Sequence, residues 1–124
     1  MAPKTRNRRL RVLFVCAMNR WRSPTAEQIY RSDPRLEVRS AGVRAEATRC
    51  LSERDLEWAD VVFVMEHGQK SWIVANFRHL ELPRIGVLDI PDEYGFMDPR
   101  LQELLRLSVE PELVSILSSD DQPT

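Results

Sequence analysis

The chain of 124 residues has little cysteine, little histidine and no long apolar run, and each shortage excludes a class of protein. Its two cysteines, Cys16 and Cys50, are too few for the disulfide framework of a small secreted domain. No cysteine and histidine cluster has the spacing of a zinc site. No apolar run reaches the ~20 residues that span a membrane, and no signal-peptide core follows the basic start. We therefore expect a cytoplasmic protein that needs no metal or other cofactor and does not insert into a membrane.

The charges are nearly balanced overall but unevenly placed along the chain. The formal net charge is −1, so nucleic acid is not favoured as a partner by charge. Basic residues crowd the first eleven positions without an acidic residue among them. We interpret residues 1–9 as a disordered, solvated tail, with an RNA-binding arm as the alternative. Residues 119–124 are expected to fray, and residues 10–118 have the length of one domain.

Apolar patterning predicts four strands, each followed by a helix. Residues 10–15 and 61–65 are continuous apolar runs, typical of strands buried on both faces. Residues 36–39 alternate as an edge strand does, and residues 84–88 supply the fourth strand. Helices are predicted from Ser23, with this serine as N-cap, from Ser52, over 66–78 and from Asp98. A separate short helix is expected after Pro111.

This alternation predicts an α/β fold: a three-layer sandwich with helices on both faces of a four-stranded parallel sheet. The two continuous apolar strands belong at the centre and the alternating second strand at an edge, which the sheet order 2-1-3-4 satisfies. Ligands bind such sheets at the carboxyl ends of the strands, where the order reverses. That point is the end of the first strand, at Cys16.

The segment from Cys16 to Pro24 has the composition of an anion site. It leads from a strand into a helix N-terminus, whose free N–H groups and dipole favour a bound anion. Arg22, in a Cys-x5-Arg spacing, can bind two phosphate oxygens with its planar guanidinium, and this positive field stabilises a Cys16 thiolate. Ser23 can donate a hydrogen bond to that thiolate, and Asn19 suits a left-handed backbone. The candidate phosphate-binding residues are therefore Ala17, Met18, Asn19, Arg20, Trp21, Arg22 and Ser23.

Together with Ser40-Ala41-Gly42 and the late segment 92–95, this loop resembles the low-molecular-weight protein tyrosine phosphatase family, especially its compact bacterial members. The resemblance implies a phosphate-monoester hydrolase that acts on a phosphorylated protein or a small aryl phosphate. Cys16 would be the nucleophile that forms a phosphocysteine, with Arg22 and the loop amides stabilising the transferred group. The resemblance also favours Asp92 as the general acid.

Two roles near the end of the fourth strand stay open at this point. Asp89 and Asp98 are alternatives to Asp92 as the acid, although Asp98, before a proline, also suits a helix cap. Tyr94 is expected either to flank the pocket and stack on an aromatic leaving group or to be a half-buried surface tyrosine. The oligomeric state and the physiological substrate are not given by the sequence.

Three positions depart from the family pattern and keep other functions open. Met18 replaces a glycine, Trp21 replaces the second cysteine of many members, and Glu93 replaces the proline after the acid. Met18 and Glu93 leave open a non-catalytic module that binds phosphate or a phosphoprotein. Together with the basic start of the chain, the phosphate loop also leaves open an RNA end or a phosphorylated nucleotide as the ligand. An arsenate reductase on the same scaffold would need a close cysteine pair after the third strand, where the sequence has none. A nucleophile and an acid beside Arg22 favour turnover, because binding alone needs neither.

Overall fold

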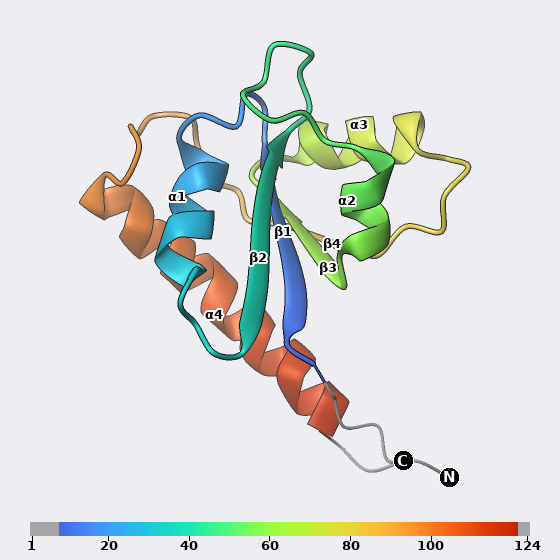
Figure 1. The fold of residues 1–124 in the computed structure, drawn as a ribbon. Coiled ribbons are helices and arrows are strands. Elements are labelled where there is room, and N and C mark those ends of the chain that lie inside the picture. Colours follow the sequence, from blue (N-terminus) through green and yellow to red (C-terminus); the bar gives the residue numbers. More distant parts are fainter. Residues whose placement is uncertain (1–7, 122–124) are drawn as a thin grey trace, which may run out of the picture.

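The computed structural model describes residues 8–121, in which strands and helices alternate along the chain (Figure 1). Each strand ends at the same edge of the sheet, drawn uppermost in Figure 1, and a helix follows it. The elements are β1 (Leu10–Cys16), α1 (Arg22–Tyr30), β2 (Leu36–Gly42), α2 (Glu53–Trp58), β3 (Val61–Val64), α3 (His67–Asn76), β4 (Arg84–Val87) and α4 (Pro99–Asp121).

The four strands form one parallel sheet in the order β2-β1-β3-β4, as the apolar patterning predicts. Val12 of β1 lies opposite Val38 on one side and Val61 on the other. The central strands β1 and β3 are buried almost throughout, which their continuous apolar sequences require. The predicted fold class and strand order are therefore confirmed.

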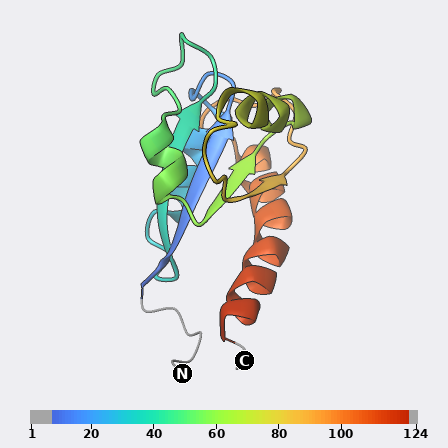
Figure 2. The same cartoon turned by 90° about the vertical axis from the view of Figure 1, so that its right-hand side faces the viewer.

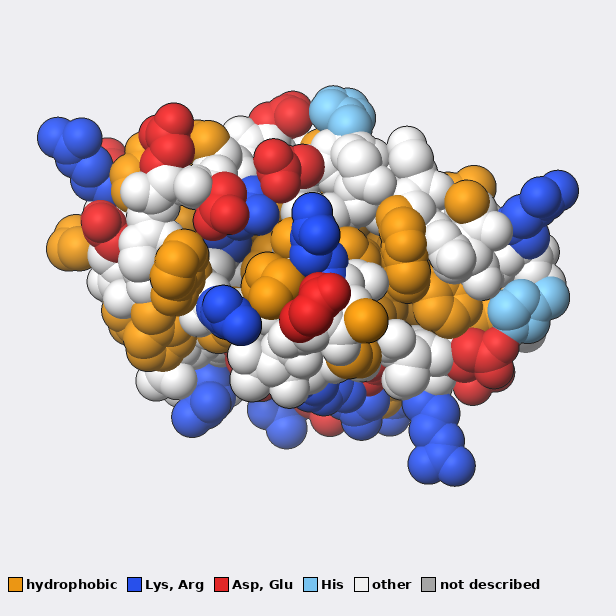
Figure 3. Space-filling view, turned by 90° about the horizontal axis from the view of Figure 1, so that it is seen from above, with side chains coloured by type: hydrophobic (Ala, Val, Ile, Leu, Met, Phe, Trp, Pro, Cys, Tyr) orange, Lys and Arg blue, Asp and Glu red, His pale blue; other side chains and the backbone are white. Residues whose placement is uncertain are grey.

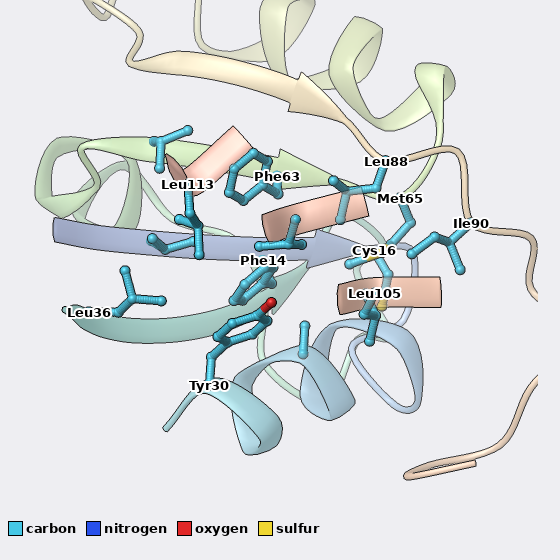
Figure 4. Packing of buried hydrophobic residues seen from close by; sticks show 14 of the residues in the cluster. Phe14, Cys16, Tyr30, Leu36, Phe63, Met65, Leu88, Ile90, Leu105 and Leu113 are labelled. Carbon is cyan, nitrogen blue, oxygen red and sulfur yellow. The ribbon is translucent and has the colours of Figure 1, made fainter. Parts of the chain in front are cut away.

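Helices cover both faces of the sheet, so the domain has three layers (Figure 2). Alternate residues of β1 and β3 point to opposite faces. Phe14 and Phe63 pack with Tyr30 of α1 and with the buried side of α4, and the rings of Phe14 and Tyr30 stack at 6.0 Å (Figure 4). Leu13, Val62 and their neighbours pack on the other face against Leu56 of α2 and Ile73 of α3.

α2 begins with a capping box formed by Ser52 and Asp55. The Ser52 hydroxyl accepts a hydrogen bond from the Asp55 N–H at 3.3 Å, and the Asp55 carboxylate accepts one from the Ser52 N–H at 3.1 Å. This reciprocal pairing satisfies two donors that a helix N-terminus otherwise leaves free.

Two helix predictions are wrong, for different physical reasons. α1 begins at Arg22 with Trp21 as N-cap, because the Ser23 hydroxyl hydrogen-bonds with other side chains instead of capping the helix. α4 continues through Pro111 as one helix instead of stopping before a second, shorter one. Pro111 lacks the N–H that would bond the carbonyl of Leu107, a residue that is 66% exposed and open to water. Leu105, Val109 and Leu113 are fully buried and hold both halves of α4 on the core.

The predicted tails fall largely outside the described residues. Residues 1–7 and 122–124 lie outside them, so the proposed disorder at both ends stays a prediction. Within the described part, the Arg8 guanidinium forms a two-point ion pair with Asp60 at 2.8 and 2.9 Å. α4 extends to Asp121. No helix in the described part of the chain has the length and apolarity to cross a membrane.

Candidate active site

Cys16 is the last residue of β1 and lies where three other segments converge. Its side chain is 3% exposed and lies near Met65, which follows β3, and Leu88 and Ile90, which follow β4 (Figure 4). The loop from Ala17 to Trp21 then leads directly into α1. The parallel topology therefore places a thiol at the point where the strand order reverses.

A chain of hydrogen bonds fixes the thiol and the loop. The Asn19 side-chain amide donates to the Ser23 and Ser40 hydroxyls at 2.9 Å each, and Ser40 in turn donates to Glu27. Because Ser23 accepts from Asn19, it can donate its one proton either to the Cys16 sulfur, 3.0 Å away, or to the Ala41 carbonyl, 3.3 Å away. Asn19 holds this position with a left-handed φ of 54°, as the sequence predicts.

The loop backbone is turned so that its N–H groups face away from the body of the protein. The carbonyl of Ala17 accepts a hydrogen bond from Arg44, and that of Met18 accepts one from Thr48, both at 3.0 Å. A peptide N–H points opposite to its carbonyl, so the following N–H groups point the other way. From Met18 to Trp21, no backbone N–H has a hydrogen-bond acceptor within residues 8–121. These free donors beside a helix N-terminus form an anion cradle.

Gly42 permits this close approach of loop and strand. A Cβ at Gly42 would lie 2.6 Å from the Ala47 side chain, 2.7 Å from the Ala17 carbonyl oxygen and 2.9 Å from the Asn19 nitrogen. Any side chain there would displace the loop. The Ser40-Ala41-Gly42 sequence thus serves the site twice, through the Ser40 hydroxyl and the missing Cβ.

Arg22 is 3% exposed and is held from one side. Its Nη1 donates to the Glu66 carboxylate and to the Ile90 carbonyl, both at 2.9 Å, and its Nε lies 3.7 Å from an Asp92 oxygen. Anchoring one nitrogen fixes the plane of the guanidinium and leaves other N–H groups for a ligand. Glu66, which the sequence suggests only as a helix start, caps α3 and also positions Arg22.

Of the three candidate acids in the described chain, Asp92 alone lines the cavity at the cradle. This cavity has a volume of about 60 Å³ and is called the phosphate cavity from here on. It is lined by Cys16, Met18, Arg20, Trp21, Arg22 and Asp92. Asp89 has a left-handed φ of 57° and lies 3.5 Å from the exposed His67. Asp98 accepts a hydrogen bond from the Arg100 N–H at the start of α4. Asp89 and Asp98 thus have local, structural contacts.

The remaining predicted residues divide between the cavity and its surroundings. Met18, Arg20 and Trp21 line the phosphate cavity, whereas Ala17 lines a larger hollow of about 660 Å³ between the 43–46 segment and α3. Tyr94 is half-buried against the core and does not line the phosphate cavity. Its predicted stacking on an aromatic leaving group stays a prediction.

Comparison with protein families shows what this loop is similar to. The model of the family described as low molecular weight phosphotyrosine protein phosphatase matches residues 11–60, which include most of β1, the cradle and α1. This part of the chain, less than half of its length, is similar to that family. Members of the family are cysteine-dependent phosphatases. Sequence comparison with curated proteins gives no match.

Solved structures share the complete fold. YfkJ from Bacillus subtilis superposes with a TM-score of 0.70 at 21% identity, over 92% of this chain and 98% of that one. YwlE arginine phosphatase from Geobacillus stearothermophilus superposes with a TM-score of 0.65 at 26% identity, over 86% of this chain and 96% of that one. The low molecular weight protein tyrosine phosphatase from T. tengcongensis superposes with a TM-score of 0.66 at 25% identity, over 87% of this chain and 99% of that one.

Proposed function

We propose that this protein is a phosphatase, and that it hydrolyses phosphate monoesters through a phosphocysteine on Cys16, with phosphotyrosine in proteins or small aryl phosphates as substrates. The observation that carries the proposal is the phosphate cavity, where a thiol, a buried guanidinium and an exposed carboxylate meet a row of free backbone N–H groups. The thiol must stay reduced to act, so we place the protein in the cytoplasm.

The first step transfers the phosphoryl group to sulfur. The Cys16 sulfur attacks phosphorus, the S–P bond forms, and the bond from phosphorus to the ester oxygen breaks. The free N–H groups and Arg22 hold the equatorial oxygens as charge develops on them. Asp92 gives its proton to the departing oxygen. Arg22 needs no reorganisation, because Glu66 and the Ile90 carbonyl already fix it.

The second step restores the enzyme. Water attacks the phosphocysteine, and the Asp92 carboxylate takes a proton from this water. The S–P bond breaks, inorganic phosphate leaves, and the sulfur departs as a thiolate. The Ser23 hydroxyl, 3.0 Å from the sulfur, can donate a hydrogen bond to it and so make it a better leaving group.

Phosphoarginine is a second candidate substrate, in which a P–N bond replaces the P–O bond. It is favoured by two exposed carboxylates near Arg22, because Asp92, which lines the cavity, and Glu66, which pairs with Arg22, can also pair with a cationic guanidinium. Glu93, next to Asp92 in the sequence, is exposed as well. Two of the similar structures, at 26% and 25% identity, are named as YwlE arginine phosphatase. A phosphotyrosine peptide and a phosphoarginine peptide of the same sequence would separate the two candidates by their kcat/KM values.

The first test is hydrolysis of p-nitrophenyl phosphate by the reduced protein. We expect turnover that Cys16→Ser abolishes, and Asp92→Asn should lower kcat for phenyl phosphate about 10²–10⁴-fold. Asp89→Asn is the matched control, since it removes a nearby carboxylate whose ion-pair contact is with His67. The catalytic proposal would be contradicted by a protein that turns over neither p-nitrophenyl phosphate nor the phosphotyrosine peptide nor the phosphoarginine peptide. Equal losses in Asp92→Asn and Asp89→Asn would contradict the role of Asp92.

A further inference from the structure

The lining of the phosphate cavity carries both signs of charge. Asp92 lines it and lies 3.7 Å from Arg22, which Glu66 holds. Arg20, on the loop before α1, also lines it. The view onto the carboxyl ends of the strands shows acidic and basic side chains close together near its centre (Figure 3). A substrate that carries charge next to its phosphoryl group therefore meets both signs of charge at the rim of the cavity.

Arg20 is the free cation of this rim. It is exposed, and its side chain has no hydrogen bond or ion pair to any residue in the part of the chain that the structure describes. Its neighbours differ: Arg22 pairs with Glu66, and Arg49 pairs with Asp55 and donates to the Ser40 carbonyl. Those two guanidinium groups serve the protein itself, whereas the Arg20 group is available to a ligand.

Arg20 also joins the phosphate cavity to a second hollow, called here the aromatic hollow. This hollow has a volume of about 680 Å³ and shares Arg20 and Trp21 with the phosphate cavity. Trp21 and Phe96 form part of its wall and are 48% and 54% exposed. A chain segment that continues from a phosphoryl group in the cavity can lie along this apolar wall, with Arg20 at the junction.

We propose that Arg20 determines specificity by binding a carboxylate next to the phosphorylated residue, so that the preferred substrates are phosphopeptides with an acidic neighbour. The proposal rests on the phosphatase function above. Asp92 repels such a carboxylate, and Arg20 attracts it at the junction of the two hollows, while Trp21 and Phe96 contact the rest of the peptide. The two signs of charge thus orient the substrate as well as bind it.

Binding to a non-turnover protein tests this inference separately from catalysis. In a Cys16→Ser background, we would measure by calorimetry the Kd of two phosphotyrosine peptides that differ only in aspartate or asparagine on both sides of the phosphotyrosine. An exposed charge pair is expected to make the aspartate peptide about two- to five-fold tighter. Arg20→Gln should bring the ratio of the two Kd values to about one. Added salt should also bring the ratio of the two Kd values toward one, because it screens an exposed charge pair.

Arg44→Gln is the matched control, since Arg44 is exposed, belongs to the 43–46 segment and lines the other hollow. It should keep the preference for the aspartate peptide. Equal Kd values in the parent protein, or no binding of either peptide, would overturn the inference. So would an Arg20→Gln variant that weakens both peptides equally, because Arg20 would then bind the phosphoryl group itself. Turnover by the wild type without any preference rejects the inference alone, whereas preferential binding without turnover rejects the catalytic proposal alone.

Discussion

Asn19 shows how a single residue can hold the loop in more than one way. Its backbone is left-handed, with a φ of 54°, and its amide donates to the hydroxyls of Ser23 and Ser40. The side chain is 5% exposed, so a replacement that removes the amide leaves these hydroxyls without their donor in a buried place. The conformation and the hydrogen bonds are separable by substitution.

Asn19→Gly should cost about 1–3 kcal/mol of stability, because it loses the two hydrogen bonds but accepts the left-handed backbone. Asn19→Ala should cost roughly 1–2 kcal/mol more, since alanine is also strained at a positive φ. Urea unfolding of both variants measures the difference. Equal stability of the alanine and glycine variants would show that the backbone conformation there is not held as described.

At this scale the sequence predicts the residues that are local to the loop. Cys16, Asn19, Arg22 and Ser23 follow from spacing within one segment, because a strand, a tight loop and a helix start define their geometry. Glu66 and Ser40 do not, since they reach the loop only through tertiary packing, from β2 and from the start of α3. Each also has an ordinary local role, Ser40 at the end of a strand and Glu66 at the start of a helix. Ser40 belongs to the motif that resembles the family, but nothing in the sequence shows that either residue contacts the loop.

Among the elements, α1 and α4 are joined by a polar brace at the end remote from Cys16. Tyr30 closes α1 and its hydroxyl donates to the Glu110 carboxylate of α4 at 2.7 Å. Burial and then this hydrogen bond raise the pKa of Tyr30 well above its usual value, so the hydroxyl stays protonated. Arg35 pairs with Asp33 and reaches the same Glu110 carboxylate at 3.3 Å.

Tyr30→Phe should lower the free energy of unfolding by about 1–2 kcal/mol, because a hydrogen bond to a charged acceptor is lost while the ring packing stays. Glu110 keeps Arg35 as a partner, which limits the loss. The measurement is chemical denaturation alongside kcat for p-nitrophenyl phosphate, and kcat should not change. Wild-type stability in this variant would mean that the brace contributes nothing, and a large loss of kcat would mean that α1 transmits the change to the loop.

The ends of the elements are where sequence reasoning is weakest, as α1 and α4 show. Periodicity depends on many residues and so predicts both helices, whereas their limits depend on single contacts. Ser23 has the composition of an N-cap, yet its hydroxyl faces Cys16. Pro111 has the composition of a stop, yet the buried side of α4 keeps the helix continuous across it. In both cases a tertiary contact outweighs a local preference.

For the whole molecule, the site is the place where most of the fold meets. The loop is held by the 43–50 segment, while Ser40 of β2, Glu66 at the start of α3 and Ile90 after β4 support its side chains. A ligand bound there contacts a structure that exists only in the folded state. Binding and folding are therefore thermodynamically linked.

Inorganic phosphate should accordingly raise the melting temperature of the reduced protein. At about 100 times its Kd, a ligand of the folded state adds ~2.7 kcal/mol, which for a domain of this size corresponds to roughly 10 °C. Sodium chloride at equal ionic strength is the control for general salt effects. Arg22→Lys keeps the positive charge but loses the planar fork, so it should reduce the shift by weakening phosphate binding. A phosphate shift no greater than that with chloride would contradict the anion cradle itself, and with it the common basis of catalysis and substrate selection.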